Sequence, residues 1–142
     1  MDLRKALGAY DAPSLQKFSL YLPELDRDEA PVPDIEKWIE AAMSILAEIN
    51  GGATRLPVAV GYWKPQNGEP MREPTNVVYS FIRNDKQFAA NLDRLVRFIH
   101  SFGKHAKQGE VMVEFSGETP GRGFVSRAYY IREYPKAGKK PF

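Results

Sequence analysis

The chain has 142 residues, of which 43% are hydrophobic and 27% are charged; these ordinary globular values exclude wholesale disorder and favour a single domain over residues 1–142. Its formal net charge of +2 is below that of most globally basic nucleic-acid binders and leaves room only for a local basic patch. The absence of cysteine excludes disulfides, thiolate catalysis and zinc sites built on sulfur.

Residues 1–16 are expected to form an N-terminal arm, because Gly8 and Pro13 interrupt any helix there. The same residues lack the apolar core of a signal peptide, and no apolar run approaches the roughly 20 residues that span a bilayer. We therefore expect a soluble, cytoplasmic protein that does not engage a membrane.

The first strand is predicted at residues 17–22, where the apolar side chains fall on one side of the pleat. Residues 23–34 follow as an exposed loop, and its acids lack the central glycine of a calcium-binding EF-hand. An amphipathic helix is then predicted from a cap at Asp34 to a stop at Gly51, because apolar residues recur every three or four positions between them.

Two strands joined by a turn are predicted next, at residues 55–63 and 77–82, with Asn67 and Gly68 in the turn. Pro57 cannot donate a ladder hydrogen bond, so the first of these strands is expected at a sheet edge or with a bulge. The second strand is apolar on both faces and is expected at a central, covered position. Regular alternation places four side chains on one face of the first strand: Leu56, Val58, Val60 and Tyr62.

A second helix is predicted from a cap at Asn84 to a stop at Gly103. Two more strands follow, at residues 110–115 and 124–134, with a glycine-rich loop between them. Residues 135–142 are expected to form a flexible, basic tail.

The elements therefore follow the order strand, helix, strand, strand, helix, strand, with one extra strand at the C-terminal end. This order predicts an α+β, ferredoxin-like βαββαβ domain in which two helices cover one face of an antiparallel sheet. The other face is left for solvent, a ligand or a second copy of the protein. We expect that bare face to carry much of the function.

Several short stretches resemble a family of small, uncharacterised bacterial proteins. The shared features are a GGAT element after the first helix, a G-x-W strand that ends at Trp63, and a late QGEV segment from Gln108 to Val111. The resemblance spans roughly residues 18–116. It implies a ferredoxin-like fold and assigns no activity, cofactor or catalytic residue.

Tyr62, Trp63 and Tyr79 are large aromatic residues near the predicted hairpin. Such residues are enriched at binding surfaces, but they also fill cores, and both interpretations stay open for the two tyrosines. Trp63 is the best single prediction for contact with a partner, and Arg72 is a further binding candidate beside it.

Glu73 follows Arg72 directly, so the two side chains point to opposite sides of the strand. Two roles are open for Glu73. It forms an ion pair with Arg127 or Arg132 of another strand, or it is a general base in a pocket on the bare face, where burial raises its pKa towards neutrality.

Glu110 and Glu114 share one face of a strand about 13 Å apart, given a rise of about 3.3 Å per residue. This separation excludes a paired-carboxylate site built from that strand alone. A paired site would need Glu73 to approach Glu110 or Glu114 from another strand, with or without a bridging metal ion.

His100 and His105 are the only histidines, and five residues across a helix end do not give the i, i+4 pair of a helical zinc site. Structural roles are the simpler interpretation for both.

The C-terminal end is basic, with tyrosines interleaved among its cations. This pattern fits a surface for single-stranded nucleic acid, but a solvated edge strand whose charges oppose aggregation is the simpler interpretation. The cationic residues are Arg122, Arg127, Arg132, Lys136, Lys139 and Lys140.

The leading hypothesis is a non-enzymatic binding or regulatory module, dimeric through its sheet face or last strand, that recognises a protein partner with the hairpin. One alternative is a small hydrolase or nuclease that uses Glu73, Glu110 and Glu114, with His100 in reserve and a divalent metal as an option. The other alternative is binding of single-stranded nucleic acid through the last strand. No cofactor and no defined metal motif is predicted.

Overall fold

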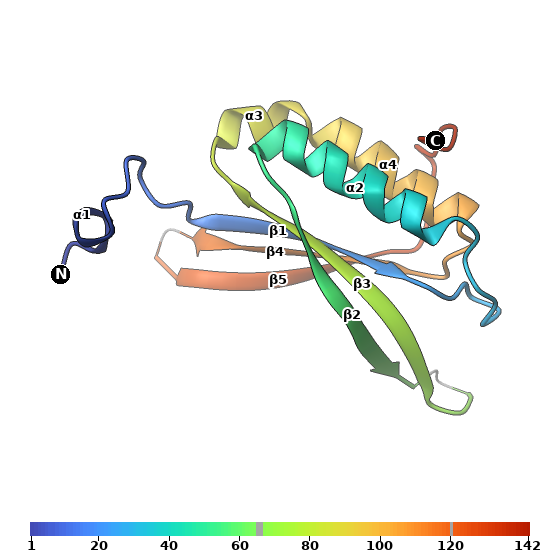
Figure 1. Ribbon diagram of the computed structural model, residues 1–142. Helices are drawn as coiled ribbons and strands as arrows, with labels where there is room; N and C mark the ends of the chain where they lie inside the picture. Colours follow the sequence, from blue (N-terminus) through green and yellow to red (C-terminus); the bar gives the residue numbers. More distant parts are fainter. Residues whose placement is uncertain (65–66, 120) are drawn as a thin grey trace.

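The computed structural model describes residues 1–64, 67–119 and 121–142, with all their side chains except those of Pro57, Trp63 and Thr119. Figure 1 shows two layers, in which α2 and α4 lie on one face of a twisted sheet and the β2–β3 hairpin extends beyond them. The elements are α1 (Leu3–Leu7), β1 (Gln16–Pro23), α2 (Ile35–Asn50), β2 (Thr54–Trp63), β3 (Met71–Ile82), α3 (Asp85–Ala90), α4 (Leu92–His105), β4 (Val111–Thr119) and β5 (Gly123–Ile131).

The five strands lie in the order β2-β3-β1-β4-β5, and each pairs antiparallel with its neighbours. Helices on one face of an antiparallel sheet, in the chain order βαββαβ, make the ferredoxin-like arrangement. β5 is the extra strand, at the edge beside β4. The predicted fold class is confirmed, as are the edge position of β2 and the central position of β3.

The core lies between the helices and the sheet. Phe18, Leu20 and Leu22 of β1 are buried beneath the helices, as their alternation predicts. The Trp38 ring of α2 packs edge-on against Phe102 of α4, with 5.4 Å between ring centres. Removal of these large apolar side chains from water is the main source of stability.

Two local features of the helices differ from the sequence prediction. Asp34 stands at the N-cap of α2, but its φ is 58° and its side chain makes no capping hydrogen bond. The second helix is divided at Asn91 into α3 and α4, and the Asn91 side-chain amide donates to the Gln87 carbonyl oxygen at 2.8 Å. The predicted cap at Asn84 is confirmed, since its side chain accepts from the Gln87 amide at 3.0 Å.

β2 carries an irregularity between Leu56 and Ala59. The extra residue changes the face to which later side chains point. Leu56 therefore points to the bare face of the sheet, whereas Val60 and Tyr62 point to the opposite face. The prediction that Leu56, Val60 and Tyr62 share one face of β2 is wrong, because it assumed regular alternation along the whole strand. The predicted bulge at Pro57 is confirmed. Residues 65 and 66 of the predicted turn lie outside the described residues.

Gly103 does not end the second helix, because α4 continues to His105. A β-carbon at Gly103 would lie 2.2 Å from the ring of Tyr134. The Tyr134 hydroxyl is held in place by donating to the Gln108 carbonyl oxygen at 2.8 Å. The glycine therefore makes room for a tyrosine that follows β5.

Replacing Gly103 with alanine is expected to lower the free energy of unfolding by roughly 1–3 kcal/mol, because the added methyl group displaces a packed ring. This exceeds the gain of about 1 kcal/mol that alanine brings to a helix interior. Denaturant unfolding measures the difference. Gly138→Ala is the control, because its β-carbon would meet nothing within 4 Å; equal stability of the two variants would contradict the packing described here.

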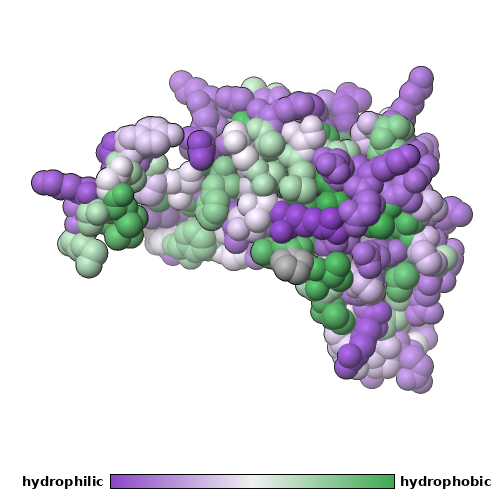
Figure 2. All heavy atoms as spheres, viewed as in Figure 1, coloured by the Kyte–Doolittle hydropathy of each residue, from purple (hydrophilic) through white to green (hydrophobic). Residues whose placement is uncertain are grey.

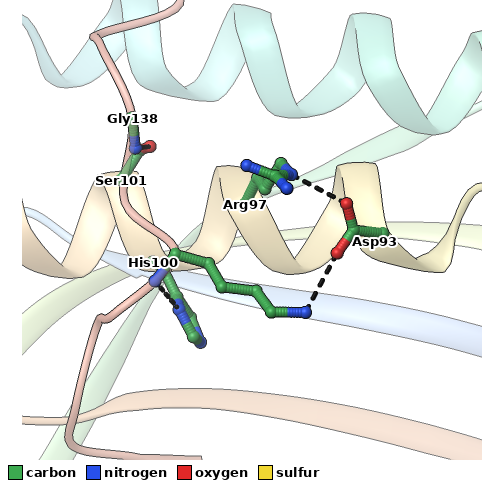
Figure 3. Close-up of polar contacts among 6 residues, drawn as sticks. Asp93, Arg97, His100, Ser101 and Gly138 are labelled. Atoms are coloured by element: carbon green, nitrogen blue, oxygen red, sulfur yellow. Dashed lines mark hydrogen bonds and ion pairs between the residues drawn. The ribbon is translucent and has the colours of Figure 1, made fainter.

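Residues 135–142, expected to form a flexible tail, lie against α4. The Lys136 amide donates to His100 Nδ1 at 3.1 Å, and the Gly138 amide donates to Ser101 Oγ at 3.0 Å (Figure 3). These residues thus have defined contacts on the helix layer. Within the described part of the chain, no helix has the length and apolar character needed to cross a membrane.

Candidate active site

Alternate residues of the strands form the sheet face that no described helix covers, which we call the open face. In β1 these residues are Lys17, Ser19 and Tyr21, since their neighbours are buried under the helices. The register places Ser19 opposite Tyr79 of β3 and Glu114 of β4. Side chains of three adjacent strands therefore meet on this face.

Glu114 is held there by hydroxyl groups from two neighbouring strands. Ser126 of β5 donates to Glu114 Oε2 at 2.6 Å, and Tyr21 of β1 donates to Oε1 at 3.4 Å. The hydroxyls of Ser116 and Ser126, which are opposite each other in the β4–β5 register, are 3.0 Å apart. We call Tyr21, Glu114, Ser116 and Ser126 the Glu114 cluster.

The electrostatics of the cluster keep its hydroxyl donors protonated. Burial raises the pKa of the Tyr21 hydroxyl, and the negative charge of Glu114 and their hydrogen bond raise it further. Each oxygen of Glu114 accepts one hydroxyl and keeps further lone pairs. A carboxylate oriented in this way attracts a cationic group or accepts a proton.

Aromatic side chains surround the cluster on the open face. Lys17 Nζ lies 5.2 Å from the centre of the Tyr79 ring, and that ring packs edge-on against Phe81 at 5.9 Å. Phe124 and Tyr130 of β5 are 66% and 62% exposed. Because ring faces and a carboxylate both attract positive charge, the surface suits an organic cation.

Figure 2 shows where apolar residues reach the surface on one side of the molecule. They gather on the hairpin, where Val58 and Val60 are exposed, and on the N-terminal arm, where Leu3 and Leu7 are exposed. The outer surface of the helix layer is mostly hydrophilic in the same view. The hairpin and the arm thus both expose apolar surface on this side.

Glu73 lies on the open face of β3, opposite Gly61 of β2. Burial raises the pKa of its carboxyl group, as one of its two predicted roles requires. Glu73 is six residues from Tyr79, which is about 20 Å along a strand at about 3.3 Å per residue. Since Tyr79 lies level with Glu114 across β1, the two carboxylates do not meet within one chain.

Replacing Glu73 with glutamine is expected to stabilise the protein at neutral pH by less than about 1 kcal/mol, the usual range outside the core. The raised pKa means that Glu73 favours the fold below its ordinary pKa of 4.5 and loses that contribution as the pH rises through the folded-state value. Denaturant unfolding at about pH 4 and about pH 7 tests this. The gain should vanish at the lower pH; a pH-independent gain would refute the burial argument.

The other two catalytic candidates lie apart from the Glu114 cluster. Glu110 precedes β4 and pairs with Arg132, with Arg132 Nε 3.6 Å from Glu110 Oε1. His100 is on α4, on the opposite side of the sheet, where its Nδ1 accepts the Lys136 amide. Burial lowers the pKa of His100, and the charge of Lys136 lowers it further. The structure therefore does not bring Glu73, Glu110, Glu114 and His100 together.

The binding candidates are spread over both edges of the sheet. Tyr62 and Arg72 are opposite each other on the β2–β3 hairpin and are exposed, and the side chain of Trp63 lies outside the described part of the structure. Arg127 is on β5, at the edge farthest from that hairpin. The predicted ion pair of Glu73 with Arg127 or Arg132 is wrong, because two strands, β1 and β4, separate β5 from β3, which carries Glu73.

The basic C-terminal end does not form one continuous stacking surface. Tyr134 is inserted against Gly103, and Lys136 is bonded to Asp93 of α4. Tyr129 and Tyr130 stay exposed on β5, but adjacent residues of a strand point to opposite faces. In the described residues, no group of three histidine, aspartate or glutamate side chains is placed to hold a metal ion.

Sequence reasoning missed Tyr21, Ser116 and Ser126. Serines and a tyrosine on strands are common, so neither residue type nor spacing marks them. The only available signal was their alternation with buried neighbours on three separate strands. That signal becomes useful once the order β1-β4-β5 and its register are known.

Two solved structures share this fold. A phage SAM lyase in complex with S-methyl-5'-thioadenosine aligns with a TM-score of 0.60 and 17% identity, over 87% of this chain and 93% of that chain. A phage SAM lyase in the apo state aligns with a TM-score of 0.60 and 16% identity, over 87% of this chain and 94% of that chain. At these identities the likeness establishes the fold. No protein-family model and no curated protein matches the chain.

Both solved structures are of an enzyme. The leading prediction from the sequence, a non-enzymatic binding or regulatory module, is therefore corrected in favour of the enzymatic alternative.

Proposed function

We propose that this chain is an enzyme that cleaves S-adenosylmethionine, or a close sulfonium analogue, at the open face. The observation that carries the proposal is the Glu114 cluster, a carboxylate held by Ser126 at 2.6 Å and Tyr21 at 3.4 Å. It is supported by a fold shared with phage SAM lyases. S-methyl-5'-thioadenosine, present in one of those structures, is the thioether that remains when the methionine side of the sulfonium is cleaved.

The chemistry of the substrate suits the surface. S-adenosylmethionine carries a sulfonium and an ammonium cation, either of which is attracted by the Glu114 carboxylate. Its adenine is flat and apolar on both faces, and the exposed rings of Phe81, Phe124 and Tyr130 offer stacking partners. The role assigned to Glu114 is to bind and orient a cationic group of the substrate.

The bond that breaks joins the sulfur to the γ-carbon of the methionine part. The electron pair stays on sulfur, so the leaving group departs as a neutral thioether and needs no proton donor. A lyase adds no water, and the four-carbon fragment therefore either loses a proton or closes on its own carboxylate. Either course releases the same nucleoside, which makes that nucleoside the product to follow.

The direct test is to incubate the full chain with S-adenosylmethionine and to analyse products by chromatography and mass spectrometry. We expect S-methyl-5'-thioadenosine and a four-carbon product in equal amounts, above a blank with heat-inactivated protein. Oxygen from labelled water at the γ-carbon of the four-carbon product would assign the chain to the hydrolase alternative, whereas label in its carboxyl group reports later opening of a lactone. No turnover above the blank would refute the proposal.

Self-association through the open face remains part of the proposal. It is supported by the apolar side chains exposed there, among them Leu56 and Phe81, which are 42% and 51% exposed. An apolar face of this kind is unusual on a free monomer. Light scattering after size exclusion should give a mass above the monomer's 16.1 kDa, and Phe81→Glu should reduce it; a monomer at all concentrations would contradict this part.

The remaining sequence predictions stay predictions. These are a cytoplasmic location, the resemblance to small bacterial proteins, a protein partner and single-stranded nucleic acid. None of them is needed for the reaction proposed above.

A further inference from the structure

A cavity lies on the helix side of the molecule, away from the open face. It has a volume of about 190 Å³ and lies between α2, α4 and the residues that follow β5. Its charged lining consists of four cations: Arg94 and Arg97 of α4, and Lys136 and Lys139 of the C-terminal segment. Such a gathering of like charges needs an explanation, because neighbouring cations repel one another.

Two carboxylates offset part of this charge. Glu48 pairs with Arg94, and Asp93 accepts from Arg97 Nε at 2.7 Å and from Lys136 Nζ at 3.0 Å (Figure 3). Hydrogen bonds from Arg97 and Lys136 lower the pKa of Asp93, which is therefore ionised at neutral pH. Among the described residues no carboxylate pairs with Lys139, so the cavity keeps an excess of positive charge.

Unused hydrogen-bond donors accompany this excess. Arg97 bonds to Asp93 through Nε, and its two terminal nitrogens make no hydrogen bond within the described residues. Ser101 is 4% exposed and lines the cavity. Its Oγ accepts from the Gly138 amide at 3.0 Å, while its own hydrogen has no acceptor among the described groups. Figure 3 shows Ser101 beside Gly138, on the face of α4 that the C-terminal segment crosses.

We propose that this cavity binds the phosphate group of a small molecule. Guanidinium groups and a hydroxyl donor match the several acceptor oxygens of a phosphate, and a second negative charge fits the excess of cations. At about 30 Å³ per water molecule, the cavity has room for roughly six waters, which suits one or two phosphate groups. Phe98 and Ile45 line its apolar side and would contact the rest of the ligand. The proposal goes beyond the cleavage reaction and does not depend on it.

Titration calorimetry of the full chain with inorganic pyrophosphate tests the proposal. Lys139→Glu reverses the lining cation that pairs with no carboxylate among the described residues, so it breaks none of the ion pairs described above, and it should weaken binding at least tenfold. Lys140→Glu is the matched control, because it makes the same charge change at the next residue, outside the cavity lining. It should change the affinity less than threefold. No binding to the unaltered chain, or equal weakening by both variants, would refute the site.

A second readout follows from the position of the ligand between α4 and the C-terminal segment. Pyrophosphate should slow tryptic cleavage after Lys136 and Lys139 in the unaltered chain. In Lys139→Glu, which has lost the cleavage site at residue 139, it should not slow cleavage after Lys136. Unchanged cleavage in both would overturn the proposal. Comparison of pyrophosphate with adenosine diphosphate separates a free oxyanion from a nucleotide, and tighter binding of either supports the site. Cleavage of S-adenosylmethionine should be the same in Lys139→Glu, so the two proposals fail independently.

Discussion

Replacing Glu114 with glutamine is expected to lower kcat/KM for S-adenosylmethionine by about 10- to 100-fold. The substitution keeps the shape of the side chain but removes the negative charge, and a hydrogen bond to a charged group contributes about 1.5–3 kcal/mol, with about 1.4 kcal/mol for each factor of ten. Release of S-methyl-5'-thioadenosine over a range of substrate concentrations measures it. A rise in KM with unchanged kcat would mark a binding role, whereas a fall in kcat would mark an interaction made in the transition state.

Glu118→Gln is the matched control for this experiment. Glu118 lies four residues along β4 on the same face and makes no hydrogen bond or ion pair with another described side chain. Its replacement should leave kcat/KM within about twofold, since exposed charges contribute little. Ser126→Ala should have an intermediate effect, because Glu114 keeps its charge but loses the hydroxyl 2.6 Å from Oε2. Full activity of Glu114→Gln would remove the Glu114 cluster from the reaction.

Replacing Trp38 with alanine is expected to lower the free energy of unfolding by about 3–5 kcal/mol. Trp38 is 1% exposed, and its ring packs edge-on against Phe102 at 5.4 Å and Phe142 at 5.1 Å. The substitution leaves a cavity where α2, α4 and the C-terminal segment meet. Because small domains have only about 5–15 kcal/mol of stability in total, denaturant unfolding should show a large shift of the midpoint.

The matched surface change is Tyr62→Ala. Tyr62 is 65% exposed on the hairpin, so its loss should change stability by less than about 0.5 kcal/mol. Trp38→Phe should fall between the two, since it keeps an aromatic ring in the core. Comparable small losses for Trp38→Ala and Tyr62→Ala would contradict the position of Trp38 at the centre of the domain.

Most of the fold was predictable because its signals are local. Alternation in β1 and the three- and four-residue spacing in α2 each depend on which side of an element faces the core. Chain order then selected the ferredoxin-like arrangement. At Gly103, where the prediction was wrong, the cause lay in a contact between distant residues. Gly103 is in the helix because Tyr134 lies against it, and no local rule distinguishes that glycine from one that ends a helix.

The candidate site was less predictable than the fold. Glu114 was one of the four catalytic candidates, but nothing in the sequence favoured it over the other three. They differ only in where the sheet places them: Glu73 lies on the hairpin side, Glu110 pairs with Arg132, and His100 lies on the helix layer. The hydroxyl donors of Glu114 come from β1 and β5, which lie on either side of β4. The separation of Tyr21 and Ser126 from Glu114 along the chain did not indicate that they would be neighbours in the fold.

The sequence alone determined the class of fold and most of the strands and long helices that build it, and it predicted an edge position or a bulge for β2. These features depend on the periodicity of neighbouring residues, and a single chain carries that information completely. The tertiary structure alone decided which carboxylate has partners, because strand order and register bring Tyr21, Glu114 and Ser126 to one place. It also decided that the basic C-terminal residues lie across α4, where hydrogen bonds to Asp93, His100 and Ser101 hold them.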